Sequence, residues 1–171
     1  MKRLTVLTTI FIFVAQAGAQ VPGLAVNVKE SLAPGASGSS EKNYCLQITL
    51  NNKSNETMEN ITILYVIGTK MPVGTGKTGD KILIERLRAE TTRTYETEPL
   101  KVVTSSAARR SRDAIAITGV HGYGVKVLVN DKNAFKFCAP PMREDEMEKF
   151  LESKKSFDAR KKKFPSGRGT Q

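Results

Sequence analysis

Hydrophobic and polar positions alternate along several short segments of the chain, which is typical of β-strands with one buried face. In Tyr44–Asn51, the residues Leu46, Ile48 and Leu50 share one face, and Leu24–Lys29 has the same pattern. The segment Ile61–Ile67 is apolar in both phases, which indicates a central strand covered on both sides. Further strands are predicted over Lys81–Leu87, Thr91–Thr104 (one interrupted strand), Ala114–Thr118, Val125–Val129 and Phe135–Cys138.

Polar and glycine-rich segments separate these strands. The short polar connection Asn52–Glu59 predicts a hairpin between its neighbouring strands. Gly68–Asp80 holds four glycines and a proline, so we expect a long mobile loop there. Gly119–Gly124 and Ser105–Asp113 are also predicted as loops, and Pro140-Pro141 ends the last strand.

One helix is predicted, close to the C-terminus. Glu144, Asp145 and Glu146 begin it, Met147, Phe150 and Leu151 follow at helical spacing, and the residues from Lys154 onward are basic. Acidic residues at the start and basic residues at the end suit the helix dipole. Six to eight short strands and one terminal helix predict an all-β fold: an immunoglobulin-like antiparallel β-sandwich of about seven strands. We assign it to residues 20–142, and a short helix with a disordered basic tail to 143–171.

The first nineteen residues have the composition of a secretory signal peptide. Lys2 and Arg3 precede the apolar run Leu4–Val14, and Ala17-Gly-Ala19 closes the segment. We therefore predict cleavage between Ala19 and Gln20 and a secreted or periplasmic protein. No later apolar stretch reaches the ~20 residues of a membrane-spanning helix, so no transmembrane anchor is expected.

The formal charge of +10 is concentrated near the C-terminus. Residues 154–171 contain seven Lys or Arg residues against Asp158 alone. Such a run either is solvated or binds an anionic partner. The candidate contacts are Arg160, Lys161, Lys162 and Lys163, together with Arg109, Arg110 and Arg112 of a predicted loop.

Motifs for catalysis or cofactor binding are weak in this sequence. Gly74–Thr78 resembles part of a phosphate-binding loop, but Met71 stands where the motif needs its first glycine, so no nucleotide is expected. His121 is the single histidine, too few for the common zinc or copper sites, and no cofactor or metal is predicted. A hydrolase whose dispersed residues gather around His121 remains an alternative.

Cys45 and Cys138 are the two cysteines. In an oxidising compartment a disulfide between them is the default expectation, and it is predicted here. Their phases, shared with Gln47 and Lys136, place both side chains away from the core. Three N-glycosylation patterns begin at Asn52, Asn55 and Asn60 and are interpreted as turn sequences that match by chance.

Several segments together resemble a known group of proteins. Leu46–Asn55 followed by Asn60-Ile-Thr-Ile-Leu-Tyr65, the Thr-rich segment Ile84–Leu100, Gly124–Asp131 and Cys138-Ala-Pro-Pro141 are similar to small secreted immunoglobulin-like proteins of planctomycete and verrucomicrobial bacteria. The resemblance covers about Leu24 to Met142. Arg88-Ala89 replaces the usual Pro-Gly turn before the Thr-rich strand. The resemblance implies a fold and export, and it carries no catalytic residues.

The sequence thus favours a non-catalytic secreted or periplasmic binding or structural module. It would act through the Gly68–Asp80 loop, the Arg109–Arg112 loop and the basic tail. A protein, a cell-envelope component or an acidic polysaccharide is the expected partner. Binding of an anionic polymer through the tail alone is the second alternative, beside the hydrolase.

Overall fold

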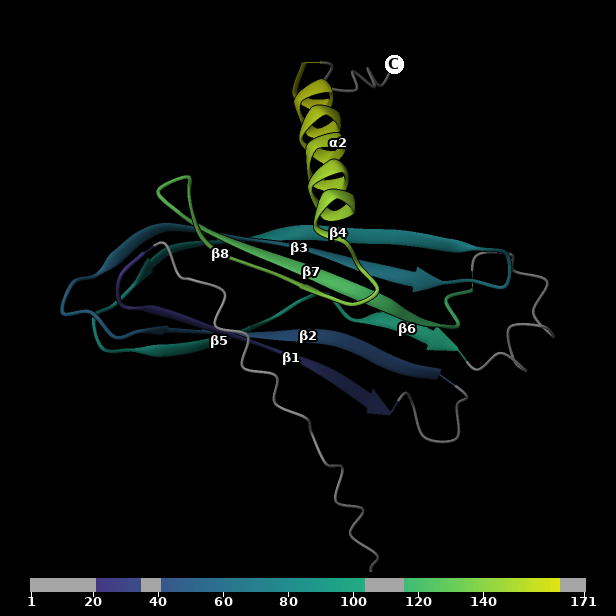
Figure 1. Ribbon diagram of the computed structural model, residues 1–171, viewed down its shortest axis with the longest axis horizontal. Helices are drawn as coiled ribbons and strands as arrows, with labels where there is room; N and C mark the ends of the chain where they lie inside the picture. The colour runs from purple at the N-terminus through teal and green to yellow at the C-terminus, as the bar shows by residue number, and fades with distance from the viewer. Residues whose placement is uncertain (1–20, 35–40, 104–115, 164–171) are drawn as a thin grey trace, which may run out of the picture.

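Two antiparallel sheets stack face to face in this computed structural model, which describes residues 21–34, 41–103 and 116–163. Sheet A is the lower layer in Figure 1 and sheet B the upper layer. Sheet A contains β1 (Leu24–Pro34), β2 (Glu41–Asn52), β5 (Thr92–Glu96) and β6 (Leu100–Val103). Sheet B has the order β4 (Thr75–Leu87), β3 (Met58–Lys70), β7 (Gly119–Val129) and β8 (Lys132–Ala139).

The two short strands β5 and β6 form one interrupted line along the edge of sheet A. β5 pairs with Gln47–Asn51 of β2, and β6 pairs with Glu41–Tyr44 of the same strand. Counted as one, they give seven strand lines, with β1, β2 and β5/β6 in one layer and β4, β3, β7 and β8 in the other. The predicted immunoglobulin-like sandwich and its interrupted Thr-rich strand are confirmed.

The main core lies between the two sheets and is built from alternate residues of each strand. In β2 every second residue from Tyr44 to Asn52 is buried, as the alternation predicts. Because the inner faces of both sheets are apolar, their stacking removes this surface from water and stabilises the sandwich. The largest fully buried apolar side chains of this core are Leu46, Ile48, Leu50, Ile61, Ile63, Ile67, Leu87, Val125 and Val127.

A second, smaller apolar cluster lies on the outer face of sheet B, under α2 (Glu144–Lys163). It consists of Val66, Met142, Met147 and Leu151. β3 therefore has apolar partners on both faces, which explains why its sequence is apolar in both phases. The helix begins at Glu144, as predicted, and runs for 20 residues, so it is longer than the short helix expected.

The expectation of a long loop over Gly68–Asp80 is wrong. β3 continues to Lys70, β4 begins at Thr75, and these two residues pair. The turn is confined to Met71–Gly74, where the amide of Met71 donates to the carbonyl of Gly74 and Gly74 has a φ of 84°. Glycine composition suggested flexibility, but the strands' backbone groups pair directly across this segment.

Two smaller predictions also need correction. Gly119–Gly124, expected to be a loop, is the first half of β7. Residues 116–118, expected to end a strand, lie outside the strands, although Ile117 accepts a hydrogen bond from Val103. Gly122 has a φ of 74°, and a shift in the β3–β7 register lies beside it between Ile67 and Thr69. This irregularity lets the glycine-rich segment stay in the sheet.

Candidate functional site

The predicted basic contacts are only partly within the described structure. Arg109, Arg110 and Arg112 lie outside the described residues. Arg160, Lys161, Lys162 and Lys163 form the last turn of α2. The four residues therefore belong to a helix and not to the disordered tail that was expected.

His121 lies half-buried on β7. Among the described residues, no hydrogen bond or ion pair links its side chain to a serine or a carboxylate. The same residues contain no group of three or more His, Cys, Asp or Glu side chains arranged to hold a metal ion. The hydrolase alternative therefore gains no support from the arrangement around His121.

The predicted disulfide between Cys45 and Cys138 is wrong, because both thiols are free. Cys45 alternates with the buried residues Tyr44 and Leu46, so it faces away from the core on sheet A. Cys138 packs into the cluster under α2, on the outer face of sheet B. Stacked sheets lie ~10 Å apart, whereas a disulfide needs Cα atoms within about 7 Å. The two outward side chains cannot meet.

Helix α2 is seated on a row of mostly small residues that crosses sheet B. Gly79 pairs with Val66, Val66 with Gly124, and Gly124 with Cys138, so one residue from each strand contributes to the row. Met147 is fully buried over this row, and its sulfur lies 3.8 Å from the sulfur of Cys138. The small side chains let the helix approach the sheet closely.

Ion pairs fix the first half of the helix to the sheet. Glu146 binds Lys77 at 2.8 Å, and Glu148 binds Lys126 at 2.8 Å. Glu144 binds Lys136, and this hydrogen bond holds the pKa of that ammonium above its usual value. In each of these pairs the helix supplies the acid and the sheet supplies the base.

In the ion pair closest to the C-terminus among the described residues, the helix supplies the base and the sheet supplies the acid. Lys154 of α2 binds Asp80 of β4 at 3.1 Å and also donates to the carbonyl of Gly79. Glu144 binds β8 and Lys154 binds β4, so the ion pairs of α2 reach both edge strands of sheet B. Figure 1 shows the C-terminal part of α2 rising clear of both sheets. The basic residues Arg160–Lys163 lie on this projecting part.

Two hollows flank α2 on the outer face of sheet B, with volumes of ≈ 240 and ≈ 250 Å³. Leu64, Leu128 and Leu151 line both. Asp80, Lys81 and Lys154 surround the first, and Lys126 and Glu148 the second. Because several of these charges already anchor the helix, the hollows are part of the helix–sheet junction.

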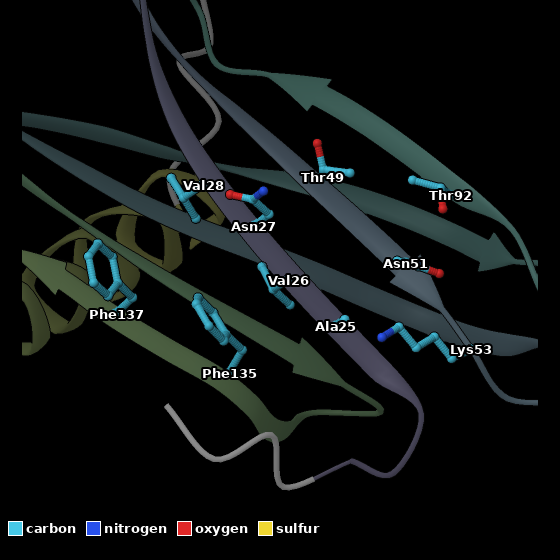
Figure 2. A pocket seen from close by; sticks show the side chains of 10 residues that line it. All are labelled: Ala25, Val26, Asn27, Val28, Thr49, Asn51, Lys53, Thr92, Phe135 and Phe137. Carbon is cyan, nitrogen blue, oxygen red and sulfur yellow. The ribbon is translucent and has the colours of Figure 1, made fainter. Parts of the chain in front are cut away.

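A separate groove of ≈ 270 Å³ follows β1, the edge strand of sheet A. Figure 2 shows Val26, Val28, Phe135 and Phe137 on one side of the β1 ribbon, and Thr49, Asn51 and Thr92 on the other. Its first side is apolar and continuous with the core. Its second side is polar and carries one charge, that of Lys53. Sequence reasoning missed this groove, because its lining comes from strands far apart in the sequence.

No protein-family model and no curated protein matches the chain. A solved structure from Akkermansia muciniphila is similar at 18% identity and a TM-score of 0.43, covering 79% of this chain and 80% of that one. R. palustris CsgH has 13% identity, a TM-score of 0.33 and coverage of 67% and 88%. The exo-chitosanase CsxA of Amycolatopsis orientalis has 8% identity and a TM-score of 0.35, with 68% of this chain matching 12% of the enzyme.

Membership of a particular family stays a prediction. At these TM-scores, function has to be argued from the residues of the chain itself. Within the described ranges, no helix combines the length and the apolar composition needed to cross a bilayer.

Proposed function

We propose that this protein is an exported, non-catalytic β-sandwich module that binds an anionic polymer of the cell envelope through the basic end of α2. Export is inferred from the composition of residues 1–19, which lie outside the described structure. The anchoring of α2 carries the proposal, because it uses the acidic side chains of the first half of the helix within the molecule.

The charges of the helix are divided along its length. Glu144, Glu146 and Glu148 each bind a lysine of sheet B, so the acidic half is neutralised within the molecule. Beyond Lys154 the sequence has a strong excess of basic residues, with Asp158 as the single acidic one. A concentrated positive charge on a projecting element attracts anionic chains and releases their counterions on binding.

Retention on an anionic polysaccharide resin, eluted with a salt gradient, tests this proposal. The test variant replaces Arg160, Lys161, Lys162 and Lys163 by Glu. The control variant replaces four exposed basic residues of the sandwich, Arg86, Arg88, Arg93 and Lys101, by Glu and has the same net charge. We expect the helix variant to elute at clearly lower salt than the control. Equal elution of the two would show that net charge alone governs retention and would contradict the proposal.

A further inference from the structure

The edges of the two sheets differ in charge. Charged side chains interrupt three of them at short intervals: Lys77, Asp80, Lys81, Glu85 and Arg86 on β4; Arg93, Glu96 and Lys101 on β5 and β6; Lys132 and Lys136 on β8. On β1, the charged residues Lys29 and Glu30 come late, and the stretch Leu24–Val28 has none. Edge charges normally prevent two sheets from joining. The first half of β1 lacks this protection.

The unprotected stretch is also the one that the groove follows. β1 pairs along its whole length with β2 on one side, and its other side has no partner strand within residues 21–34, 41–103 and 116–163. Ala25–Val28 line the groove of ≈ 270 Å³. The backbone N–H and C=O groups of β1 that point away from β2 favour another extended polypeptide as the occupant. A strand placed there would form hydrogen bonds with these groups in register.

The side chains along the groove define which strand fits. On the inner side, the half-buried Val26, Val28 and Phe137 offer apolar surface next to the core. On the outer side, Asn27, Thr49 and Asn51 are neutral, and Lys53 adds one positive charge at the end of the groove (Figure 2). The occupant therefore needs apolar residues at alternate positions and small or neutral residues between them. The segment Leu24-Ala-Val-Asn-Val28 of β1 has this pattern itself.

We propose that a second copy of this chain fills the groove, with the two β1 strands paired antiparallel about a two-fold axis at Asn27. This register places Val26 of one copy opposite Val28 of the other, on the core side of the sheet. Lys29 then lies opposite Ala25, and Glu30 opposite Leu24. Between the two β1 strands no like charges are opposite each other, so this source of repulsion is absent from the register.

The symmetry determines how the dimer presents its helices. Antiparallel pairing of two edges continues one sheet into the next, with the two-fold axis perpendicular to it. Both copies of sheet B, and both α2 helices, then lie on the same face of the dimer. Where the proposed function holds, two basic helix ends would engage one polymer together and increase its apparent affinity. The dimer itself does not depend on that function.

Analytical ultracentrifugation of the protein recovered after export tests the proposal. We expect a concentration-dependent dimer. Asn27 is exposed, so Asn27→Lys should leave the fold intact. The substitution places two positive charges together at the two-fold axis, and we expect it to raise the dissociation constant of the dimer by about tenfold or more. Thr94→Lys, an exposed position on β5 at the opposite edge of the sheet, is the matched control and should leave the dimer unchanged.

A charge-complementation arm tests the register. Asn27→Lys and Asn27→Asp should each dissociate alone and form a heterodimer when mixed, because only opposite charges then meet at the axis. Circular dichroism checks that both variants keep their β-structure. A wild-type protein that remains monomeric at high concentration would overturn the proposal, whatever other molecule then binds the groove. A mixture that stays monomeric would overturn the two-fold axis at Asn27.

Discussion

Met147 of α2 lies directly against Gly124 of β7. A β-carbon at position 124 would be 2.4 Å from the sulfur of Met147 and 2.9 Å from its Cγ, far closer than such atoms approach in proteins. The glycine is therefore required by the docked helix and not by the strand, where a side chain would ordinarily be preferred. The contact couples the helix that carries the basic end to the sheet that orients it.

Gly124→Ala is expected to destabilise the protein by about 1–3 kcal/mol, because the added methyl group overpacks the junction with Met147. Thermal unfolding followed by circular dichroism measures the change. Gly119→Ala, in the same strand, is the control, since its nearest neighbour would be 3.8 Å from the new carbon. In a Met147→Ala background the cost of Gly124→Ala should largely disappear. A full cost in that background would contradict the assigned contact.

The sandwich could be predicted from the sequence because alternation is a local signal. Each strand of the core shows it within its own residues, as Leu46, Ile48 and Leu50 do in β2. The row of small residues under α2 could not be predicted in this way. Gly79, Val66, Gly124 and Cys138 come together only through the registers of four strands, and the sequence of each strand contains one member of the row.

The two glycine-rich segments were also predicted wrongly because the contacts that explain their glycines lie on other strands. The glycines of Gly68–Asp80 and Gly119–Gly124 predict loops, whereas most of both segments lies in strands. Gly79 and Gly124 instead allow close approach, since a β-carbon at Gly79 would be 2.2 Å from the carbonyl oxygen of Tyr65. Whether a glycine provides flexibility or space depends on the neighbouring strand. That neighbour is not visible in a local pattern.

Asn52 is a buried polar residue whose hydrogen bonds close the β2–β3 hairpin. Its Nδ2 donates to the carbonyls of Glu56, Leu87 and Arg88, and its Oδ1 accepts from the amide and the hydroxyl of Ser54. Asn52→Ala leaves these groups without partners, so we expect a loss of about 2–4 kcal/mol in unfolding free energy. Chemical denaturation measures it.

The neighbouring Asn51→Ala is the control for Asn52, because Asn51 lies on the outer face of sheet A and should cost little. The same burial bears on glycosylation. A glycan on Asn52 would replace one of the two Nδ2 hydrogens and would need space at a fully buried side chain, so the folded protein should not carry one there. Mass spectrometry after expression in a glycosylating host checks this, and a modified Asn52 in stable protein would contradict the assignment.

The two thiols should both be free and should differ in reactivity. The sequence already placed Cys45 and Cys138 away from the core, and that signal outweighs the general expectation of a disulfide in an oxidising compartment. Burial raises the pKa of the Cys138 thiol, and the charge of Glu144 adds to this shift. Because the thiolate is the reactive form, we expect Cys138 to be alkylated more slowly than Cys45.

Alkylation of the single variants Cys45→Ser and Cys138→Ser, followed by intact mass, measures the two rates separately. Unfolding in denaturant should bring the rates together, since the difference arises from the folded environment. An intact mass that lacks two hydrogens and resists alkylation until reduction would show an intramolecular disulfide instead.

The ion pair between Lys154 and Asp80 should make the anchoring of α2 sensitive to acid. Burial disfavours ionisation of Asp80. The hydrogen bonds from the ammonium of Lys154 and the amide of Lys81, together with the charges of these two lysines, outweigh burial and lower the pKa of Asp80 below its usual 3.8. A lowered pKa in the folded state stabilises the protein above pH 3.8, and this stabilisation is lost as the pH falls through the folded value. The effect should be small, because the pair is partly exposed.

The difference in melting temperature between wild type and Asp80→Asn isolates this contribution from the other carboxylates. We expect the wild type to be slightly more stable near pH 6 and the two proteins to converge in strong acid. Salt should reduce the difference at pH 6, since it screens partly exposed charges. A constant difference across the pH range would show that the pair does not anchor the helix.

Burial, with a smaller contribution from the charge of Glu30, should delay the ionisation of two tyrosines to alkaline pH. Burial raises the pKa of Tyr123 to about 12, and the charge of Glu30 adds to the shift. Burial and then Glu30 also raise the pKa of Tyr44. A raised pKa means that the folded protein holds these protons more tightly than the unfolded chain does. The resulting stability is complete below pH 10 and is lost as the pH rises toward 12.

Glu30→Gln removes the charge and keeps the shape of the side chain, so the tyrosinate absorbance of Tyr123 should rise at a lower pH. Tyr123→Phe should make unfolding less sensitive to pH between 10 and 12, because the residue can no longer ionise in the unfolded chain. Both are followed by spectrophotometric titration and by melting at a series of alkaline pH values. If Glu30→Gln leaves the titration unchanged, its carboxylate does not act on the tyrosines, and burial alone accounts for the shift.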